Sequence, residues 1–158
     1  MAHEYRAEIV WTRGDAPFLD RRYSRAHVWR FDGGVEVPAS SSPLSVKVPL
    51  SRVDAVDPEE AFVAALSSCH MLFFLDFAAR DGFVVDRYED AALGAMSRNE
   101  RGKLFVSKVT LNPSVAFSGA KQPSSDDVDA LHHRAHEECY IANSVRTEVV
   151  VAARHSVS

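Results

Sequence analysis

One long apolar stretch, residues 61–79, constrains the fold of this chain more than any other feature of its sequence. Just before it, Asp57 supplies an N-cap side chain, Pro58 suits the first helical position, and Glu60 completes a capping box. The predicted helix runs from Pro58 to Arg80 and is apolar on nearly every side. Because such a helix is covered on more than one face, we expect it to be the spine of the fold, or to be covered partly by a second subunit.

Composition is typical of a single globular domain spanning residues 1–158. Apolar residues make up 46% of the chain and charged residues 25%, which excludes a disordered protein. The formal net charge of −4 argues against nucleic acid as a partner. The first residues lack the layout of a signal peptide, and polar residues interrupt the apolar stretch. We therefore expect a cytoplasmic protein with no membrane segment.

Alternation of apolar and polar residues predicts strands on both sides of the long helix. The predicted strands cover residues 5–11, 23–31, 35–37, 83–96, 104–117 and 147–152, with a further short strand at 45–50 in the Ser- and Pro-rich loop. A second helix is predicted from Ser124 to Asn143, with Cys139 on its apolar stripe. This order of elements indicates the α+β class.

The chain contains two cysteines, Cys69 on the long helix and Cys139 on the second helix. In a reducing compartment such a pair is more often catalytic, redox-active or metal-binding than a permanent disulfide. Both lie on predicted core-facing stripes. If they meet, one thiol can attack a peroxide and the other can resolve the resulting sulfenic acid. The alternative is that both are small buried hydrophobic residues.

A buried thiol is inert unless a nearby cation stabilises its thiolate. Arg25 is our candidate, because it shares a predicted strand face with His27 and Trp29 and because arginine keeps its charge in the interior. The alternative is that Arg25 lies beyond the buried part of the strand and reaches water. Glu59, in the first turn of the long helix, could orient an arginine through a bidentate pair.

Histidines beside both cysteines make a zinc site a further alternative. His70 follows Cys69, and His136 comes one helical turn before Cys139. However, adjacent helical residues point about 100° apart, so Cys69 and His70 would not easily bind one ion, and no C-x-x-C spacing occurs. We therefore expect no metal and no bound cofactor. The histidines of the second helix are expected to form a partly solvated face: His132, His133 and His136.

Two motifs resemble the OsmC/Ohr family of osmotically inducible and organic hydroperoxide resistance proteins. The first is Asp57-Pro58-Glu59-Glu60, followed by an alanine-rich apolar run and Ser67-Ser68-Cys69. The second is Cys139-Tyr140-Ile141-Ala142-Asn143-Ser144. The resemblance follows the order of elements along the whole chain. It implies an OsmC-like fold, with antiparallel sheets around a long buried central helix, in an intertwined homodimer with active sites at the subunit interface.

The resemblance also implies an activity, the reduction of organic hydroperoxides by thiols. Cys69 would be the peroxidatic cysteine and Cys139 the resolving one. Arg25 would hold the thiolate, and Glu59 would orient Arg25. A dithiol such as dihydrolipoamide would restore the two thiols.

Two positions depart from the family pattern. His70 stands where an aromatic residue commonly follows the first cysteine, and Tyr140 stands where proline usually follows the second. The chain therefore resembles a separate OsmC-like branch. The alternative function is that of a non-catalytic protein that binds a small molecule or senses redox state on the same fold, in which His70 would serve packing or ligand contact.

Overall fold

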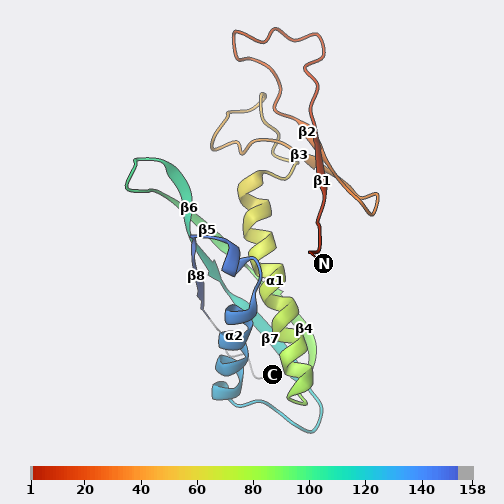
Figure 1. Ribbon diagram of the computed structural model, residues 1–158, viewed down its shortest axis with the longest axis vertical. Coiled ribbons are helices and arrows are strands. Elements are labelled where there is room, and N and C mark those ends of the chain that lie inside the picture. The colour runs from red at the N-terminus through yellow and green to blue at the C-terminus, as the bar shows by residue number, and fades with distance from the viewer. Residues whose placement is uncertain (1, 153–158) are drawn as a thin grey trace. The chain divides into compact units, whose positions relative to one another are not determined.

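The computed structural model describes residues 2–152 of the chain, whose elements are drawn in Figure 1. The elements form two compact units, Met1–Ala61 and Phe62–Ser158, and each is described by itself. Strands come before, between and after two helices. The predicted α+β class is therefore confirmed.

A three-stranded antiparallel sheet in the order β1-β2-β3 forms the base of the first unit (Figure 1). Its strands are β1 (Ala7–Val10), β2 (His27–Phe31) and β3 (Glu36–Ala39). The short strand predicted at residues 45–50 is absent, because local backbone bonds close turns there instead. The predicted start of the second strand at Tyr23 is too early. The backbone N–H of Arg25 donates to the carbonyl of Leu50 at 2.8 Å, so it is not available to a sheet partner. Arg25 thus precedes the strand that carries Trp29.

The long helix α1 (Pro58–Arg80) has the predicted bounds. The Glu60 N–H donates to Asp57 Oδ1 at 2.8 Å, and the Asp57 N–H donates to Glu60 Oε2 at 3.2 Å. This reciprocal pair is the capping box expected from the sequence. Gly82, with φ of +83°, follows the C-terminus in the left-handed conformation that glycine adopts without strain.

Within the described residues, α1 buries one stripe completely: Leu66, His70, Phe74 and Ala78. Leu72, on another side, is 60% exposed. By length and composition alone the helix is also apolar enough to cross a membrane, and 22% of that apolar window is buried. A single chain therefore leaves part of this apolar helix uncovered.

Two sheets belong to the second unit, together with α1 from Phe62 onward. β4 (Val84–Asp90) pairs antiparallel with β7 (Pro113–Ser118). β5 (Leu93–Arg98) pairs antiparallel with β6 (Leu104–Leu111), which in turn pairs in parallel with β8 (Glu148–Val151). The antiparallel sheets predicted from the sequence are thus present, with one parallel pair added to them.

Each of the strands predicted over residues 83–96 and 104–117 divides into two. The division falls at Asp90 and Asn112, where side chains replace strand hydrogen bonds. The Asn112 N–H donates to Asp90 Oδ1 at 2.7 Å, and the Asn112 amide group donates to the Ala91 carbonyl at 3.0 Å. Because these bonds take up backbone groups at the junction, the chain leaves one sheet there and enters the other.

The second helix, α2 (Ser125–Glu138), ends earlier than predicted. Ser124 and Asp127 form a capping box at its start. Cys139 is the C-cap residue, with an extended backbone (φ −61°, ψ 111°), and a short 3-10 turn, η1 (Ala142–Ser144), follows it. Cys139 therefore lies in the turn that leaves α2, and not on the stripe of a continuing helix.

The core of the second unit has two parts, and α1 contributes to both. Around its C-terminal half, the buried side chains come from α1, β7, α2 and the residue before β4: Phe74, Ala78, Phe83, Val115, Leu131 and Ala135. Around its N-terminal half they come from α1 and β6: Leu66, Val109 and Leu111. Cys69 lies between the two parts along α1.

Candidate functional site

Cys69 and Cys139, far apart in the sequence, are neighbours in space, close enough for the Cys69 thiol to act on the pKa of Cys139. Both are free thiols. Cys139 is 1% exposed, whereas Cys69 is half-buried and therefore the more accessible of the two. Two thiols in contact are placed to react with each other once either is oxidised to a sulfenic acid.

Burial raises the pKa of the Cys139 thiol to about 11, and contact with the Cys69 thiol acts in the same direction. The Ala142 N–H donates to Cys139 Sγ at 3.4 Å and works against this shift by favouring the thiolate. Within residues 2–152, no guanidinium or ammonium group is among the causes of the shift. Cys139 is therefore a protonated thiol at neutral pH.

The polar residues that follow Cys139 hold the turn in which it lies. The Asn143 amide group donates to the carbonyls of Glu137 and Cys139, at 2.8 and 3.0 Å. The Ser144 hydroxyl donates to the Tyr140 carbonyl at 2.7 Å. These bonds satisfy carbonyl groups that have no partner inside α2. The motif from Cys139 to Ser144 thus has a structural role in fixing the backbone around the thiol.

Arg25 belongs to the first unit, whereas both cysteines belong to the second. Its guanidinium donates to the carbonyl of Arg21 at 2.8 Å and also to that of Tyr23, and it lies over the Tyr23 ring, 3.9 Å from the centroid. In the part of the chain that the structure describes, no carboxylate pairs with this guanidinium. Its charge therefore remains available to an anion.

Glu59 lies half-buried in the first turn of α1. Its neighbour Glu60 is used in the capping box, but the Glu59 carboxylate has no hydrogen-bond or ion-pair partner among residues 2–152. The predicted four-residue site thus appears in two portions. The structure brings Cys69 and Cys139 together, while Arg25 and Glu59 lie in the first unit, where no described residue pairs with either charge.

A buried histidine pair lies in the core, contrary to the prediction of a solvated histidine face. His70 on α1 is 1% exposed and His132 on α2 is 4% exposed. Their rings stack with centroids 5.3 Å apart, and His70 Nε2 lies 3.0 Å from His132 Nδ1. Burial, followed by the influence of His136, lowers the pKa of His70 to about 4, so that His70 is neutral at pH 7. Among these side chains, His133 does face solvent.

The sequence contained one signal for this pair. His132 lies between Leu131 and Ala135 on the buried side of α2, and His70 lies one turn from Leu66 and from Phe74 on α1. Helical spacing alone therefore assigns both imidazoles to core-facing stripes.

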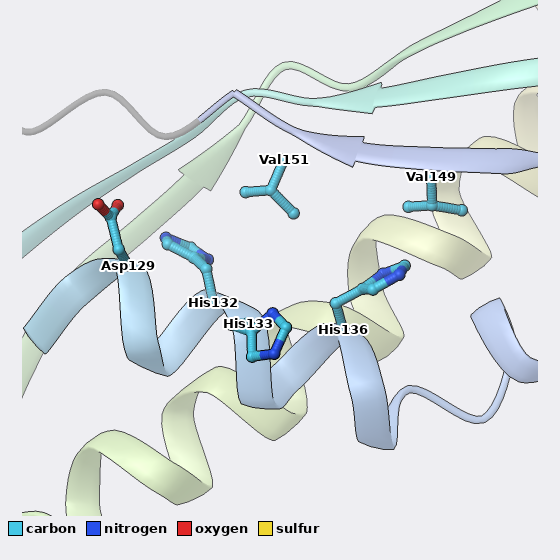
Figure 2. A pocket seen from close by; sticks show the side chains of 6 residues that line it. All are labelled: Asp129, His132, His133, His136, Val149 and Val151. Carbon is cyan, nitrogen blue, oxygen red and sulfur yellow. The ribbon is translucent and has the colours of Figure 1, made fainter. Parts of the chain in front are cut away.

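A cavity of about 260 Å³ opens between α2 and β8 (Figure 2). The side chains that line it are Asp129, His132, His133, His136, Val149 and Val151. His136 Nδ1 is buried without a hydrogen-bond partner among the described residues. Nevertheless, no three His, Cys, Asp or Glu side chains in that part of the chain are arranged to hold a metal ion. His132, His133 and His136 thus line the cavity together.

Known proteins resemble this chain along its length. The family model for OsmC-like protein matches residues 51–154. The solved structure of an OsmC-like protein of unknown function from Vibrio cholerae is 52% identical, covers 97% of this chain and 100% of that chain, and has a TM-score of 0.95. No curated protein matches the chain.

More distant solved structures share the fold. An organic hydroperoxide resistance protein from Elizabethkingia anophelis, with thiocyanate bound, is 18% identical over 100% of both chains, with a TM-score of 0.68. The organic hydroperoxide resistance protein of Bacillus subtilis is 18% identical over 95% of this chain and 98% of its own, with a TM-score of 0.64. At these identities the likeness is one of fold alone.

Proposed function

The chain belongs to the OsmC-like protein family, and on that premise we propose that it is a thiol-dependent peroxidase that reduces organic hydroperoxides. The observation that carries the proposal is the contact between the free thiols of Cys69 and Cys139. Relatives that are named organic hydroperoxide resistance proteins have the same fold, which supports this choice of substrate class.

The reaction has three steps. The Cys69 thiolate attacks the distal oxygen of the hydroperoxide, the O–O bond breaks, and the alcohol leaves with a proton, so that Cys69 becomes a sulfenic acid. Cys139 then attacks the Cys69 sulfur, a disulfide forms, and the sulfenic hydroxyl leaves as water with the Cys139 proton. A dithiol such as dihydrolipoamide reduces the disulfide by exchange and is itself oxidised to a cyclic disulfide.

Exposure supports the assignment of roles to the two cysteines. Cys69 is half-buried and accessible to a hydroperoxide, whereas Cys139 is 1% exposed. The raised pKa of Cys139 also keeps it protonated, which makes it the poorer first nucleophile. The two free thiols fit a reducing compartment, so we place the protein in the cytoplasm.

We assign Arg25 the stabilisation of the Cys69 thiolate and Glu59 the orientation of Arg25. The absence of an opposite charge beside either group, among residues 2–152, supports this assignment. Arg25→Ala should slow the oxidation of Cys69 at pH 7, and higher pH should restore it because hydroxide then removes the thiol proton. Arg25→Lys should retain part of the rate, since it keeps the charge but not the planar fork. Oxidation of Arg25→Ala at the wild-type rate at pH 7 would exclude the role.

We further propose that residues 1–158 act as one domain per protomer of a homodimer, with the second copy covering the exposed side of α1. The apolar side chain of Leu72 is 60% exposed on α1, and an exposed apolar surface of this kind supports such an interface. Sedimentation should give the mass of a dimer, and Leu72→Glu should shift it toward the monomer. Leu104→Glu, at the exposed start of β6, is the matched control and should remain dimeric. A wild-type protein that sediments as a monomer would refute the assembly.

The activity is tested by following the consumption of cumene hydroperoxide in the presence of dihydrolipoamide. The wild type should turn over, and Cys69→Ser should not. Without reductant, the wild type should consume one equivalent and stop as the disulfide, whereas Cys139→Ser should consume a second equivalent slowly, because its unresolved sulfenic acid is oxidised to a sulfinic acid. His133→Ala, an exposed change on α2, is the control and should behave as wild type. Consumption by Cys69→Ser as fast as by wild type would show the mechanism to be wrong.

A second candidate is a protein that binds a small apolar molecule or senses redox state without turnover. The raised pKa of Cys139 favours it, because a thiol that stays protonated resolves a sulfenic acid slowly. Native mass spectrometry separates the two functions. A retained ligand, with cysteines that do not respond to cumene hydroperoxide, would support the binding protein.

A further inference from the structure

We propose that Tyr140 is a positioning residue: its contact with Phe73 keeps the turn that carries Cys139 against α1, and so sets how readily Cys139 and Cys69 form a disulfide. The biological role of this contact rests on the proposed peroxidase function. The geometry itself can be tested without a hydroperoxide.

The ring contact spans the same two segments as the thiol contact. Phe73 lies four residues, or one helical turn, after Cys69 on α1, and Tyr140 immediately follows Cys139. The two rings meet edge to face, with centroids 5.0 Å apart and an interplanar angle of 89°. Edge-to-face pairs of this kind are attractive beyond the area that they bury. The aromatic pair therefore ties the two thiol-bearing segments together beside the thiols.

Within residues 2–152, no hydrogen bond fastens this turn to α1. Among the described residues, the side-chain bonds of Asn143 and Ser144 stay within the turn and the end of α2. Apart from the thiol contact, apolar contacts hold the turn on the helix. Ile141 packs in the core cluster of the N-terminal half of α1, before Cys69, and Tyr140 packs on the other side of it. The contacts made by Ile141 and Tyr140 thus lie on the two sides of Cys69 along α1.

Tyr140 is an unusual anchor because its side chain is largely in solvent. It is 69% exposed, so its ring contributes little to the buried core. Its removal should therefore leave the fold intact and loosen one end of the turn. As a result, the Cys139 sulfur should lie beside the Cys69 sulfur less often. A looser turn lowers the effective concentration of Cys139 at Cys69.

The same loosening would slow the resolving step of the proposed cycle. In that step the Cys139 sulfur bonds to the Cys69 sulfur, the S–O bond of the sulfenic acid breaks, and water leaves. A slower step leaves the sulfenic acid exposed to a second molecule of hydroperoxide, which oxidises it to a sulfinic acid and releases another alcohol.

The direct test is the equilibrium of the purified protein with glutathione. One glutathione disulfide oxidises the two thiols to the Cys69–Cys139 disulfide and yields two reduced glutathione molecules. Tyr140→Ala should lower this equilibrium constant roughly three- to tenfold, the factor expected for loss of an aromatic pair. Tyr140→Phe should retain the wild-type value, because the contact needs the ring and not the hydroxyl. Leu104→Ala, exposed on β6, is the control for loss of an exposed apolar side chain.

A double-mutant cycle shows whether Tyr140 acts through Phe73. In a Phe73→Leu background, Tyr140→Ala should have little further effect on the equilibrium constant. The inference is overturned if Tyr140→Ala equals wild type, or if it costs as much with Leu at position 73 as with Phe.

Cumene hydroperoxide then separates this inference from the proposed function. If it does not oxidise Cys69 in the wild type, the proposed function fails, and the glutathione equilibrium still decides the role of Tyr140. If it does, Tyr140→Ala should leave the rate of Cys69 oxidation unchanged and slow the appearance of the disulfide by the same factor. A slower first step with an unchanged second step would overturn the inference.

Discussion

The imidazoles of His70 and His132 share a hydrogen bond in the core, with 3.0 Å between Nε2 of the first and Nδ1 of the second. The bond joins α1 to α2, and the Phe74 ring packs against His132 with centroids 4.4 Å apart. His70 directly follows Cys69, so the pair fixes the rotation of α1 next to the thiol. Because neighbouring helical side chains diverge by about 100°, His70 points into the core while Cys69 lies on a different side of the helix.

The buried pair predicts that stability rises with pH between about 4 and 6.5. Burial, then His136, lowers the pKa of His70 from 6.5 to about 4, while Asp90 opposes the shift. In this range the unfolded chain binds a proton that the folded protein does not, so the free energy of unfolding increases with pH. The shift corresponds to at most about 3 kcal/mol. Urea unfolding across this pH range measures it.

His70→Gln is the matched variant, because a buried amide can still hydrogen-bond to His132 but does not titrate. It should lose this part of the pH dependence, whereas His133→Gln, at the exposed position on α2, should keep it. An identical slope in wild type and His70→Gln would contradict the assignment.

Gly94 on β5 is predicted to be intolerant of any side chain, because α1 approaches it closely. A Cβ atom at Gly94 would lie 2.6 Å from Cγ2 of Val63. Gly94→Ala should therefore lower the free energy of unfolding by about 1–3 kcal/mol, as overpacking does, and Val63→Ala should relieve part of that loss. Gly33→Ala is the control, since no atom lies within 4 Å of its Cβ position. Equal unfolding midpoints for the two alanine variants would disprove the close approach.

Asp57 should contribute to stability as the N-cap of α1. It is 7% exposed, and its carboxylate accepts the Glu60 N–H at 2.8 Å. Asp57→Ala removes the acceptor of this part-buried N–H at the start of α1 and should cost about 1–2 kcal/mol in urea unfolding. Asp54→Ala, which removes an exposed partner of Arg52, should change the midpoint little. If Asp54→Ala lowered the free energy of unfolding as much as Asp57→Ala does, the stabilising role of the capping box would be refuted.

Alkylation should report the raised pKa of Cys139. With a pKa of about 11, the thiol is protonated at pH 8, and only the thiolate reacts with iodoacetamide. The rate at Cys139, located by peptide mass, should keep rising with pH up to pH 10, while circular dichroism verifies that the protein remains folded. A rate that levels off below pH 9 would mean that burial does not control this thiol.

Local signals predicted much of the fold. The bounds of α1 followed from Asp57, Pro58 and Glu60, because capping depends on neighbours in the sequence. The division of the strands at Asp90 and Asn112 was not predictable, since it depends on hydrogen bonds between residues more than twenty positions apart.

For the site as well, local motifs were predictable from the sequence and contacts between distant residues were not. The motifs at Cys69 and Cys139 indicated a thiol pair, and the fold makes the two thiols neighbours. The early end of α2 was missed because the Asn143 side chain caps its last carbonyls, an arrangement that apolar periodicity does not reveal. Alternation predicts Arg25 on a strand face, but the Arg25 backbone N–H donates to the Leu50 carbonyl in a later loop.

The intact mass of the reduced protein after exposure to one equivalent of cumene hydroperoxide measures whether Cys69 and Cys139 complete a peroxidase cycle. The wild type should lose two hydrogens, with a Cys69–Cys139 disulfide in the peptide map, and Cys69→Ser should show no such change. An unchanged wild-type mass, or an oxygen adduct at Cys69 that never proceeds to the disulfide, would rule out this cycle.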